Sequence, residues 1–161
     1  MSISIIIPVK NEEQIIIKTL KKFEESWIVE VEHEILIIND NSNDKTVDLI
    51  ENTKFEKLNI ILKNNPKIGL GSAITAAINN SSKEFVSIYM ADMSDSLEDL
   101  KIYYETIKKN NLLDAIFGSR FIKNAKVINY PKFKFLINRF ANSFIKVIFF
   151  SKYNDFTNAF K

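Results

Sequence analysis

The residues best suited to chemistry lie around Asp92, at the end of a short apolar stretch. Residues 85–90 are mostly β-branched, aromatic or aliphatic and are bounded by polar residues, which predicts a buried strand. From residue 97, leucine, tyrosine and isoleucine recur at helical spacing, so a helix should begin soon after Asp92. A carboxylate between a strand end and a helix N-terminus can hold a divalent cation against a phosphate. Asp92 is therefore a candidate metal ligand.

The polar residues that follow Asp92 have a simpler explanation. Ser96 with Asp99 three residues later matches a capping box, and acidic side chains in a first turn suit the helix dipole. For Asp95, Ser96, Glu98 and Asp99 we therefore favour helix capping over metal binding. Asp92 precedes the cap, and capping does not account for it.

Strands and helices alternate along most of the chain. Further strands are predicted at residues 2–9, 30–40, 58–62 and 113–117, all apolar runs bounded by polar or turn residues. Helices are predicted between them, the first capped by Asn11 with Gln14 in the capping-box position. The alternation predicts a parallel sheet between two helical layers, joined by right-handed crossovers. The length of 161 residues predicts one domain, residues 1–161.

Polar residues follow four of the predicted strands. They are Pro8 to Glu12, Asn39 with Asp40, Asp92, and Gly118 to Arg120. Because the carboxyl ends of parallel strands share one edge of a sheet, we expect these residues to meet there. Each group alone has a structural explanation as a cap, a turn or a surface ion pair. Four groups at one edge fit a nucleoside diphosphate with a metal better.

Composition argues against several classes of protein. A net charge of +2 is too small for a dedicated nucleic-acid binder, which usually carries a strong basic excess. The absence of cysteine excludes disulfides and thiolate metal sites and fits a reducing compartment. The first residues lack the basic and long apolar regions of a signal peptide, and no apolar run is long enough to span a membrane.

Residues 130–150 differ in character from the rest of the chain. Aromatic and aliphatic side chains alternate there with basic ones, namely Lys132, Lys134, Arg139 and Lys146. This pattern predicts one or two amphipathic helices suited to a membrane interface. A helix that covers the sheet and keeps its lysines in solvent is an equal alternative.

Six stretches together resemble family 2 glycosyltransferases of the GT-A fold. They are residues 4–13 (SIIIPVKNEE), 37–46 (IINDNSNDKT), 69–73 (GLGSA), 90–94 (MADMS), 117–121 (FGSRF) and 155–161 (DFTNAFK). Within the family, they are most similar to the polyprenyl-phosphate branch of dolichol-phosphate mannose synthase-like enzymes. The resemblance spans essentially the whole chain. It implies a Rossmann-like three-layer α/β/α sandwich with a mostly parallel sheet and C-terminal amphipathic helices.

The resemblance implies transfer of a sugar from a UDP- or GDP-linked donor. The nucleotide-sugar site would comprise Pro8, Glu12, Ile38, Asp40, Ala91, Asp92 and Arg120. Pro8 and Glu12 would border the base and ribose, and Asp40 would bind one of these groups. Asp92 would hold Mg²⁺ or Mn²⁺ between the phosphates, and Arg120 would contact the sugar diphosphate. Asp92 and Arg120 are thus the candidate catalytic residues.

Three positions depart from the family pattern. The paired acids of the metal motif appear here as Met90-Ala91-Asp92, so the first carboxylate is missing. Lys10 stands where relatives often carry Tyr or Thr, and Asn39 stands where Asp is common. We therefore expect a metal to bind weakly unless the diphosphate supplies further ligands.

The sequence offers no obvious catalytic base, because its one histidine, His33, is remote from the strand ends. A sugar hydroxyl needs such a base, whereas a phosphate monoester, with a second pKa of about 6, is already an anionic nucleophile at pH 7. This favours a polyprenyl-phosphate acceptor. The resemblance further implies an inverting, metal-assisted enzyme at the cytoplasmic, inner face of a membrane. The alternatives are transfer to a saccharide hydroxyl in cell-surface polysaccharide synthesis and a degenerate, non-catalytic nucleotide-binding domain. The last motif stops at Lys161, so we expect a C-terminally truncated catalytic domain.

Overall fold

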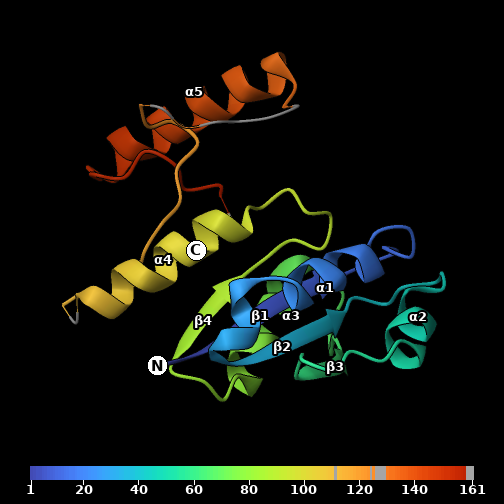
Figure 1. The fold of residues 1–161 in the computed structure, drawn as a ribbon. Helices are drawn as coiled ribbons and strands as arrows, with labels where there is room; N and C mark the ends of the chain where they lie inside the picture. Colours follow the sequence, from blue (N-terminus) through green and yellow to red (C-terminus); the bar gives the residue numbers. More distant parts are fainter. Residues whose placement is uncertain (111, 124, 126–129, 159–161) are drawn as a thin grey trace. The chain divides into compact units, whose positions relative to one another are not determined.

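The computed structural model describes residues 1–110, 112–123, 125 and 130–158 (Figure 1). The chain divides into two compact units, Met1–Asp114 and Ala115–Lys161. Each unit has its own set of hydrogen bonds and its own packing. The single domain expected over residues 1–161 stays a prediction.

The first unit is built on a parallel sheet, as the alternating pattern predicts. Its strands are β1 (Ser2–Val9), β2 (Glu32–Asn39), β3 (Ile60–Asn64) and β4 (Phe85–Ile88), in the order β3-β2-β1-β4. Between them lie α1 (Ile16–Glu24), the 3₁₀ helix η1 (Trp27–Glu30), α2 (Thr46–Asn52) and α3 (Leu70–Asn80), and α4 (Leu97–Lys109) follows β4. All strand pairs are parallel, and four of the five predicted strands agree with the observed ones to within two residues at each end. The α/β prediction is confirmed.

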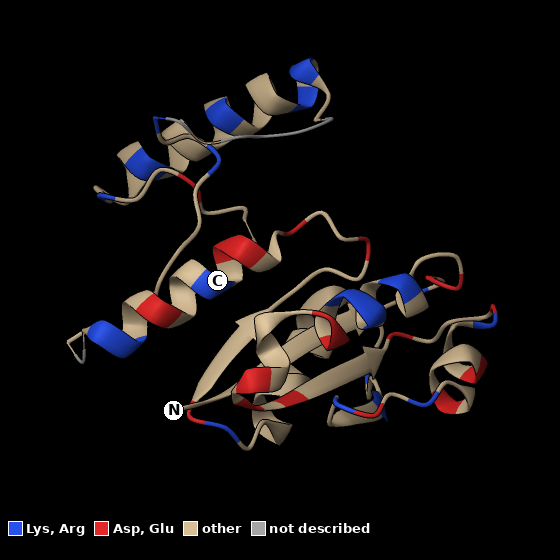
Figure 2. Cartoon of the chain, viewed as in Figure 1, with Lys and Arg blue, Asp and Glu red and all other residues tan. Residues whose placement is uncertain are grey.

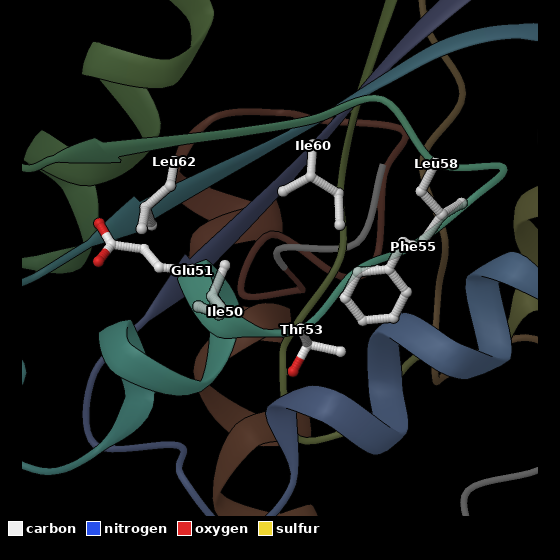
Figure 3. A pocket seen from close by; sticks show the side chains of 7 residues that line it. All are labelled: Ile50, Glu51, Thr53, Phe55, Leu58, Ile60 and Leu62. Atoms are coloured by element: carbon white, nitrogen blue, oxygen red, sulfur yellow. The ribbon is translucent and has the colours of Figure 1, made fainter.

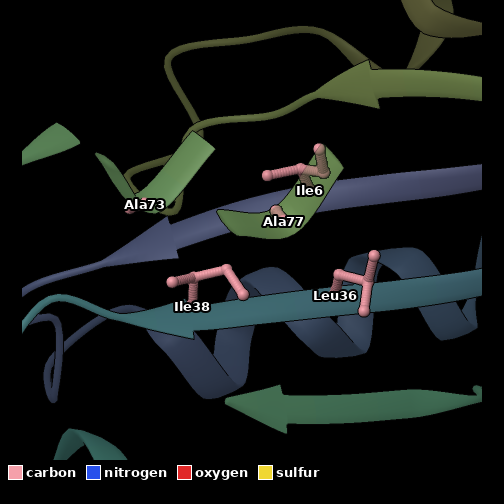
Figure 4. Packing of buried hydrophobic residues seen from close by; sticks show 5 residues of the cluster. All are labelled: Ile6, Leu36, Ile38, Ala73 and Ala77. Atoms are coloured by element: carbon pink, nitrogen blue, oxygen red, sulfur yellow. The ribbon is translucent and has the colours of Figure 1, made fainter. Parts of the chain in front are cut away.

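Two helices cover opposite faces of this sheet (Figures 1 and 4). On one face, Ile6, Leu36 and Ile38 pack against Ala73 and Ala77 of α3, and all five side chains are buried. The small alanines let α3 lie close to the strands, so a larger side chain there would overpack the core at a cost of about 1–3 kcal/mol. On the other face lies α1, whose apolar stripe is fully buried. The three layers follow from this arrangement.

The predicted strand at residues 113–117 does not form. Residues 113–117 form no strand in the structure as described, and the neighbouring Leu112 is exposed. A run of five residues is too short for periodicity alone to decide, and Asp114 interrupts its apolar character. Gly118 to Arg120 therefore does not follow a strand, and the expected set of four polar strand ends is reduced to three.

The start of α1 also differs from the prediction. Asn11 does not cap the helix, which begins at Ile16 with no side-chain cap. Asn11 instead adopts a left-handed backbone conformation (φ 57°), and its Oδ1 accepts a hydrogen bond from the Asn43 N–H at 2.8 Å. The tertiary hydrogen bond takes the side chain that a local cap would have used.

The second unit contains α5 (Lys132–Ile148). This helix buries Asn142 and exposes large apolar side chains that recur every three or four residues, including Phe133, Phe140 and Phe144. Figure 2 shows its basic residues, and the helix sequence contains no acidic residue. The predicted amphipathic segment is thus a single helix over most of residues 130–150. No helix in the described part of the chain is long and apolar enough to cross a membrane.

Candidate functional site

The loops that follow β1 and β2 are tied together by hydrogen bonds in both directions. The Glu12 N–H donates to Thr46 Oγ1 at 2.8 Å, and the Glu13 N–H donates to Asp44 Oδ2 at 3.1 Å. In return, the Lys45 N–H donates to Glu13 Oε2 at 2.9 Å. These N–H groups are therefore not available to a phosphate. The two loops instead form a fixed rim at the carboxyl ends of the central strands.

Asp40 lies on this rim, directly after β2. Its Oδ1 accepts hydrogen bonds from the Gly69 N–H at 2.9 Å and from Asn65 Nδ2 at 2.6 Å. Its Oδ2 lies 3.6 Å from the Lys10 ammonium. The Gly69 and Asn65 hydrogen bonds, helped by Lys10, outweigh desolvation and hold the pKa of Asp40 below its usual value. Asp40 is therefore ionised at neutral pH and acts only as an acceptor.

The loop contact to Asp40 requires glycine at position 69. Gly69 has φ 119° and ψ 147°, a backbone conformation that residues with a Cβ rarely adopt. There is open space where a Cβ would stand, so the constraint comes from the backbone and not from a neighbour. Asn65 was not singled out by the sequence, although its place before Pro66 and Gly69 marks a turn.

Pro8 and Ile38 are register partners inside the sheet, and neither lies beyond a strand end. Pro8 is buried and β1 continues to Val9. The Ile38 side chain belongs to the core cluster beneath α3. This leaves only the main chain of Ile38 to face a ligand.

Asp92 is exposed, four residues beyond the end of β4. Its Oδ1 accepts a hydrogen bond from the Ser94 N–H at 2.9 Å, and Met93 between them is left-handed at φ 58°. The preceding Ala91 is buried, and its carbonyl accepts a hydrogen bond from Thr19 Oγ1 of α1 at 2.6 Å. The Thr19 bond fixes the chain just before Asp92, so the carboxylate projects from a tethered turn.

Asp95 does not cap α4. Ser96 does, because its Oγ accepts a hydrogen bond from the Asp99 N–H at 3.1 Å, as predicted. Asp95 turns back to the strand end instead, where its Oδ2 accepts from the Met90 N–H at 2.8 Å and its carbonyl accepts from Tyr89 Oη at 2.7 Å. Burial, with a smaller contribution from Asp92, raises the pKa of Asp95 to about 6 against the lowering effect of the Met90 N–H.

A divalent metal would find few protein ligands here. The described part of the chain contains no group of three or more His, Cys, Asp or Glu side chains placed to hold a metal ion. The pKa of Glu12 is raised, mainly because the side chain is partly buried and to a smaller extent because of the negative charges of Asp92 and Asp44. Glu12 and Asp92 are therefore close enough for their charges to interact. Asp92 therefore fits a metal that takes its other ligands from a diphosphate and water, and does not fit a metal held by protein alone.

Arg120 belongs to the second unit, where Asp155 holds it. Arg120 Nε and Nη2 donate to the two carboxylate oxygens of Asp155 at 2.8 and 2.7 Å, and Nη2 also donates to Thr157 Oγ1 at 2.7 Å. Asp155 is fully buried, and the hydrogen bonds from Arg120 keep its pKa below the usual value although burial alone would raise it. The expected free guanidinium is thus largely committed to a structural pair.

The remaining part of Arg120 faces Tyr130. Arg120 Nη1 donates to Tyr130 Oη at 3.4 Å, and Asn138 Nδ2 donates to the same hydroxyl. The Arg120 Cζ lies 5.8 Å and Lys134 Nζ 5.5 Å from the Tyr130 ring centroid. Two cations therefore gather around one tyrosine beside α5. The sequence did not single out Tyr130 as a site residue, since no spacing rule links it to Arg120.

Among the hollows formed by the described residues, two are lined by first-unit residues other than Asp40 and Lys10. One, of about 270 Å³, lies between α2 and the edge strand β3 (Figure 3) and is lined by apolar residues with Glu51 as its one charged lining side chain. The other, of about 460 Å³, lies between the end of α1 and the start of α4, and Asp95, Tyr89 and Trp27 contribute to its wall. The first lacks the polar groups that a diphosphate needs.

Comparison with known proteins places the chain in a family. The model of the family described as Glycosyl transferase family 2 matches residues 4–160. The chain belongs to this family. The last three residues of its final motif, residues 159–161, lie outside the described residues.

Curated relatives carry transferase names. A probable glycosyltransferase YdaM of Bacillus subtilis is 28% identical over 87% of this chain, and a dolichol-phosphate mannosyltransferase of Pyrococcus furiosus is 26% identical over 88%. A dolichyl-phosphate beta-glucosyltransferase ALG5A of Trichomonas vaginalis is 33% identical over 83%. The chain spans 33%, 39% and 44% of the lengths of these three relatives.

Solved structures share the fold. Residues 1–349 of S. aureus TarS in complex with UDP-GlcNAc match 69% of this chain with a TM-score of 0.60 and 26% identity, over 32% of the TarS chain. The same TarS fragment in complex with UDP matches 81% of this chain with a TM-score of 0.61 and 22% identity, over 44% of the TarS chain. The fold is therefore that of GT-A glycosyltransferases.

Proposed function

We propose that this chain is the donor-binding, catalytic part of an inverting glycosyltransferase that moves a sugar from a nucleoside diphosphate sugar to a polyprenyl phosphate. The observation that carries the proposal is the strand-end site of Glu12, Asp40 and Asp92 in a chain of this family. In an open α/β sheet, ligands bind beyond the carboxyl ends of the strands, which is where these three carboxylates stand.

Each residue of the donor site has a role that its geometry supports. Asp40 accepts a hydrogen bond from the base or ribose through its open oxygen, and Glu12 and Pro8 border the same groups. The main chain of Ile38 and Ala91 lines the site. Asp92 would hold Mg²⁺ or Mn²⁺, which when bound would offset the charge that develops on the departing diphosphate. Arg120 Nη1 donates one hydrogen bond to Tyr130 Oη and has a second N–H that could serve a phosphate.

The acceptor phosphate would bind beside Tyr130. Lys134 brings a positive charge to this ring, Arg120 contributes the N–H groups of Nη1 while its charge is paired with Asp155, and Asn138 adds an amide donor. A phosphate monoester is an acceptor of hydrogen bonds and is anionic at neutral pH, so it suits such a group. It also needs no catalytic base, and His33 cannot supply one, because it lies at the amino end of β2 with Nδ1 bonded to the Val31 carbonyl.

The lipid part of the acceptor would lie along α5. Phe140, Phe144 and Phe150 are 76%, 62% and 94% exposed, an unusual density of exposed aromatic side chains for one helix and its end. Basic residues flank them, so the segment suits an anionic membrane surface. We place the enzyme at the cytoplasmic, inner face of the membrane.

Two assays test the proposal. In the first, UDP- and GDP-sugars are supplied with Mn²⁺ and either a polyprenyl phosphate or a saccharide acceptor. Transfer to the lipid phosphate is expected, and Asp92→Asn should reduce it at least about 100-fold. Transfer to the saccharide alone would establish the alternative acceptor. Lys134→Met should raise the KM for the lipid phosphate without changing the KM for the donor. Lys152→Met, which removes the same charge from an exposed position in the second unit, is the matched control.

The second assay measures membrane binding. The chain should co-sediment with anionic vesicles at low salt and be partly released at high salt. Replacing Lys132, Lys134, Arg139 and Lys146 by Gln should remove the anionic preference and leave nucleotide binding intact, since each basic residue contributes about 1 kcal/mol near such a surface. If the wild-type protein does not co-sediment with anionic vesicles at low salt, α5 is a packing helix and not a membrane-binding one.

A non-catalytic nucleotide-binding domain is the second candidate function, and the single carboxylate of the metal motif favours it. Such a domain would bind nucleoside diphosphates but would show neither transfer nor hydrolysis of any nucleotide sugar. Calorimetric titration of Mn²⁺ with and without UDP or GDP adds a further test. Equal metal affinity in both conditions would contradict a metal shared with the diphosphate.

A further inference from the structure

Thr19 is a polar residue in the buried apolar stripe of α1. The other buried residues of the stripe are Ile16, Leu20 and Phe23. A buried hydroxyl costs free energy unless it makes a hydrogen bond, whereas valine has almost the same shape and carries no such cost. Thr19 Oγ1 lies 2.6 Å from the Ala91 carbonyl oxygen and 3.2 Å from the Ile15 carbonyl oxygen of its own helix. A hydroxyl has one hydrogen to donate, so the shorter contact to Ala91 takes it.

The segment that this hydroxyl holds is the turn at residues 90–95. The Met90 N–H donates to Asp95 Oδ2 at 2.8 Å and so closes the turn across its two ends. Tyr89 Oη donates to the Asp95 carbonyl at 2.7 Å, and the Tyr89 ring packs edge-on against Phe23 of α1, with ring centroids 4.8 Å apart. Contacts with α1 and a hydrogen bond across its ends therefore fix this turn.

Asp92 is the exposed carboxylate of the turn. Its Oδ1 accepts a hydrogen bond from the Ser94 N–H at 2.9 Å, and none of the described residues donates one to its Oδ2. Met93 is left-handed at φ 58°, a conformation that a bulky residue keeps only where the surrounding contacts hold it. The turn therefore orients the Asp92 carboxylate and leaves one of its oxygens open to a ligand.

The helix that holds this turn also meets the loop after β1. The Glu12 carbonyl accepts hydrogen bonds from the Ile15 and Ile16 N–H groups at 3.0 and 2.9 Å, which joins Glu12 to the start of α1. Thr19 lies about one helical turn further along. The helix thus connects the two parts of the strand-end site, with Glu12 at its start and the Asp92 turn bound to Thr19.

We propose that Thr19 and Asp95 are positioning residues that hold the Asp92 carboxylate for a divalent metal. This inference rests on the proposed function. A metal that finds one carboxylate in its motif depends on how well that carboxylate is fixed, because a mobile ligand would have to be ordered when the metal binds. Thr19 acts through the Ala91 carbonyl, and Asp95 acts through the Met90 N–H.

Thr19→Val removes the hydroxyl and keeps the shape of the side chain. The test is calorimetric titration of Mn²⁺ into the full chain saturated with UDP or GDP, whichever binds. Mn²⁺ affinity should fall about tenfold, as it does when other partners of metal ligands are removed. Nucleotide affinity measured in EDTA should be unchanged. Thr19→Ser restores the hydroxyl and should recover wild-type Mn²⁺ affinity, whereas wild-type affinity in Thr19→Val would remove Thr19 from the assignment.

Thr106→Val is the matched control. Thr106 lies on α4, and its hydroxyl donates to the Ile102 carbonyl of the same helix at 2.6 Å. This variant removes a helical hydroxyl whose hydrogen bond stays within its own helix, so no change in Mn²⁺ affinity is expected. An equal loss in Thr106→Val and Thr19→Val would come from general destabilisation and would overturn the positioning role of Thr19.

Two variants of Asp95 separate its hydrogen bond from its charge. Asp95→Ala removes the acceptor of the Met90 N–H, whereas the amide oxygen of Asp95→Asn can still accept this bond. Mn²⁺ affinity should fall about tenfold in Asp95→Ala and stay near the wild-type value in Asp95→Asn. An equal loss in both variants would show that the charge matters and not the hydrogen bond, and would remove Asp95 from the assignment.

The wild-type titrations distinguish failure of this assignment from failure of the proposed function. If neither UDP nor GDP binds, both fail. If a nucleotide binds and Mn²⁺ does not, the assignment fails together with metal assistance, and nucleotide binding stands. If both bind and every variant matches the wild type, the positioning assignment alone is overturned.

Discussion

Glu34 lies near the amino end of β2 and Asp40 directly follows its carboxyl end, and the two carboxylates differ in how their oxygens are hydrogen-bonded. At the amino end of the sheet, Glu34 Oε1 accepts from Ser4 Oγ and the Ser82 N–H, at 2.6 and 2.7 Å, and Oε2 accepts from Ser82 Oγ at 2.7 Å. Asp40, after the carboxyl end of β2, has both hydrogen bonds on one oxygen. Glu34 is 2% exposed and ties β2 to β1 and to the loop before β4, whereas Asp40 keeps one oxygen for a ligand.

The second unit contains a third buried carboxylate, Asp155, which resembles Glu34 in this respect. Both Asp155 oxygens accept hydrogen bonds from Arg120, and the side chain has no exposed surface. A buried carboxylate with both oxygens satisfied serves stability, and one with an open oxygen at a strand end can serve binding. The following variants test this distinction, starting with the largest expected effect.

Asp155→Ala should destabilise the second unit by about 3–5 kcal/mol, since it leaves the Arg120 charge without its buried partner. Hydrogen exchange of the α5 amides measures the effect, and the amides of β1 and β2 are the internal control. The pKa of Asp155 is lowered, so its contribution is present above the usual carboxyl pKa and is lost as the pH falls through the folded-state value. Unchanged protection of α5 would show that the pair is not structural.

Glu34→Ala should lower the free energy of unfolding by about 2–3 kcal/mol, because Ser4, the Ser82 N–H and the Ser82 hydroxyl lose their acceptor. Denaturant titration at pH 7 measures it. Burial would raise the pKa of Glu34, but these hydrogen bonds outweigh it and the pKa is lowered, so the wild-type advantage should shrink as the pH falls below about 4. UDP affinity should not change; a large loss of affinity would break the contrast with Asp40.

Asp95→Asn should change the pH dependence of stability. The raised pKa, about 6, means that the folded state holds a proton that the unfolded state releases near pH 4. Wild-type stability should therefore fall as the pH rises from about 4 to 6, and the variant should lack this slope. At pH 7 we expect the free energy of unfolding of Asp95→Asn to exceed that of the wild type by about 1–2 kcal/mol. This is less than the whole pKa shift would give, because part of the Asp95 carboxyl faces solvent. Thermal unfolding across pH 4–8 measures it, and parallel curves would contradict the buried state of Asp95.

Glu32→Gln should have the smallest effect on the free energy of unfolding, close to none, although it breaks an ion pair with Lys83 at 2.7 Å. The Glu32 side chain is 72% exposed, so solvent already screens the pair. Denaturant titration beside Glu34→Ala compares an exposed and a buried carboxylate at the same end of the sheet. If Glu32→Gln lowered the free energy of unfolding as much as Glu34→Ala does, the ion pair and not burial would determine the stabilising effect of a carboxylate at this end of the sheet.

The sequence by itself determined the class of fold and the edge at which the site lies. Apolar runs of strand length report burial on both faces, and alternation with helices forces parallel pairing, so Asp40 and Asp92 had to follow strands at one edge. The cap at Ser96 was also predictable, because its hydrogen bond is made within three residues. Family membership followed from motifs that the chain carries in order.

Only the tertiary structure decided which side chains remain able to bind a ligand. Arg120 is committed to Asp155, 35 residues away, and Asp40 gives one oxygen to Asn65, 25 residues away. Asp95 turns from the helix to the strand end, and residues 113–117 find no strand to pair with in the structure as described. Local periodicity reports how much of a segment is buried, but hydrogen-bond partners distant in sequence are chosen by packing, which no local pattern contains.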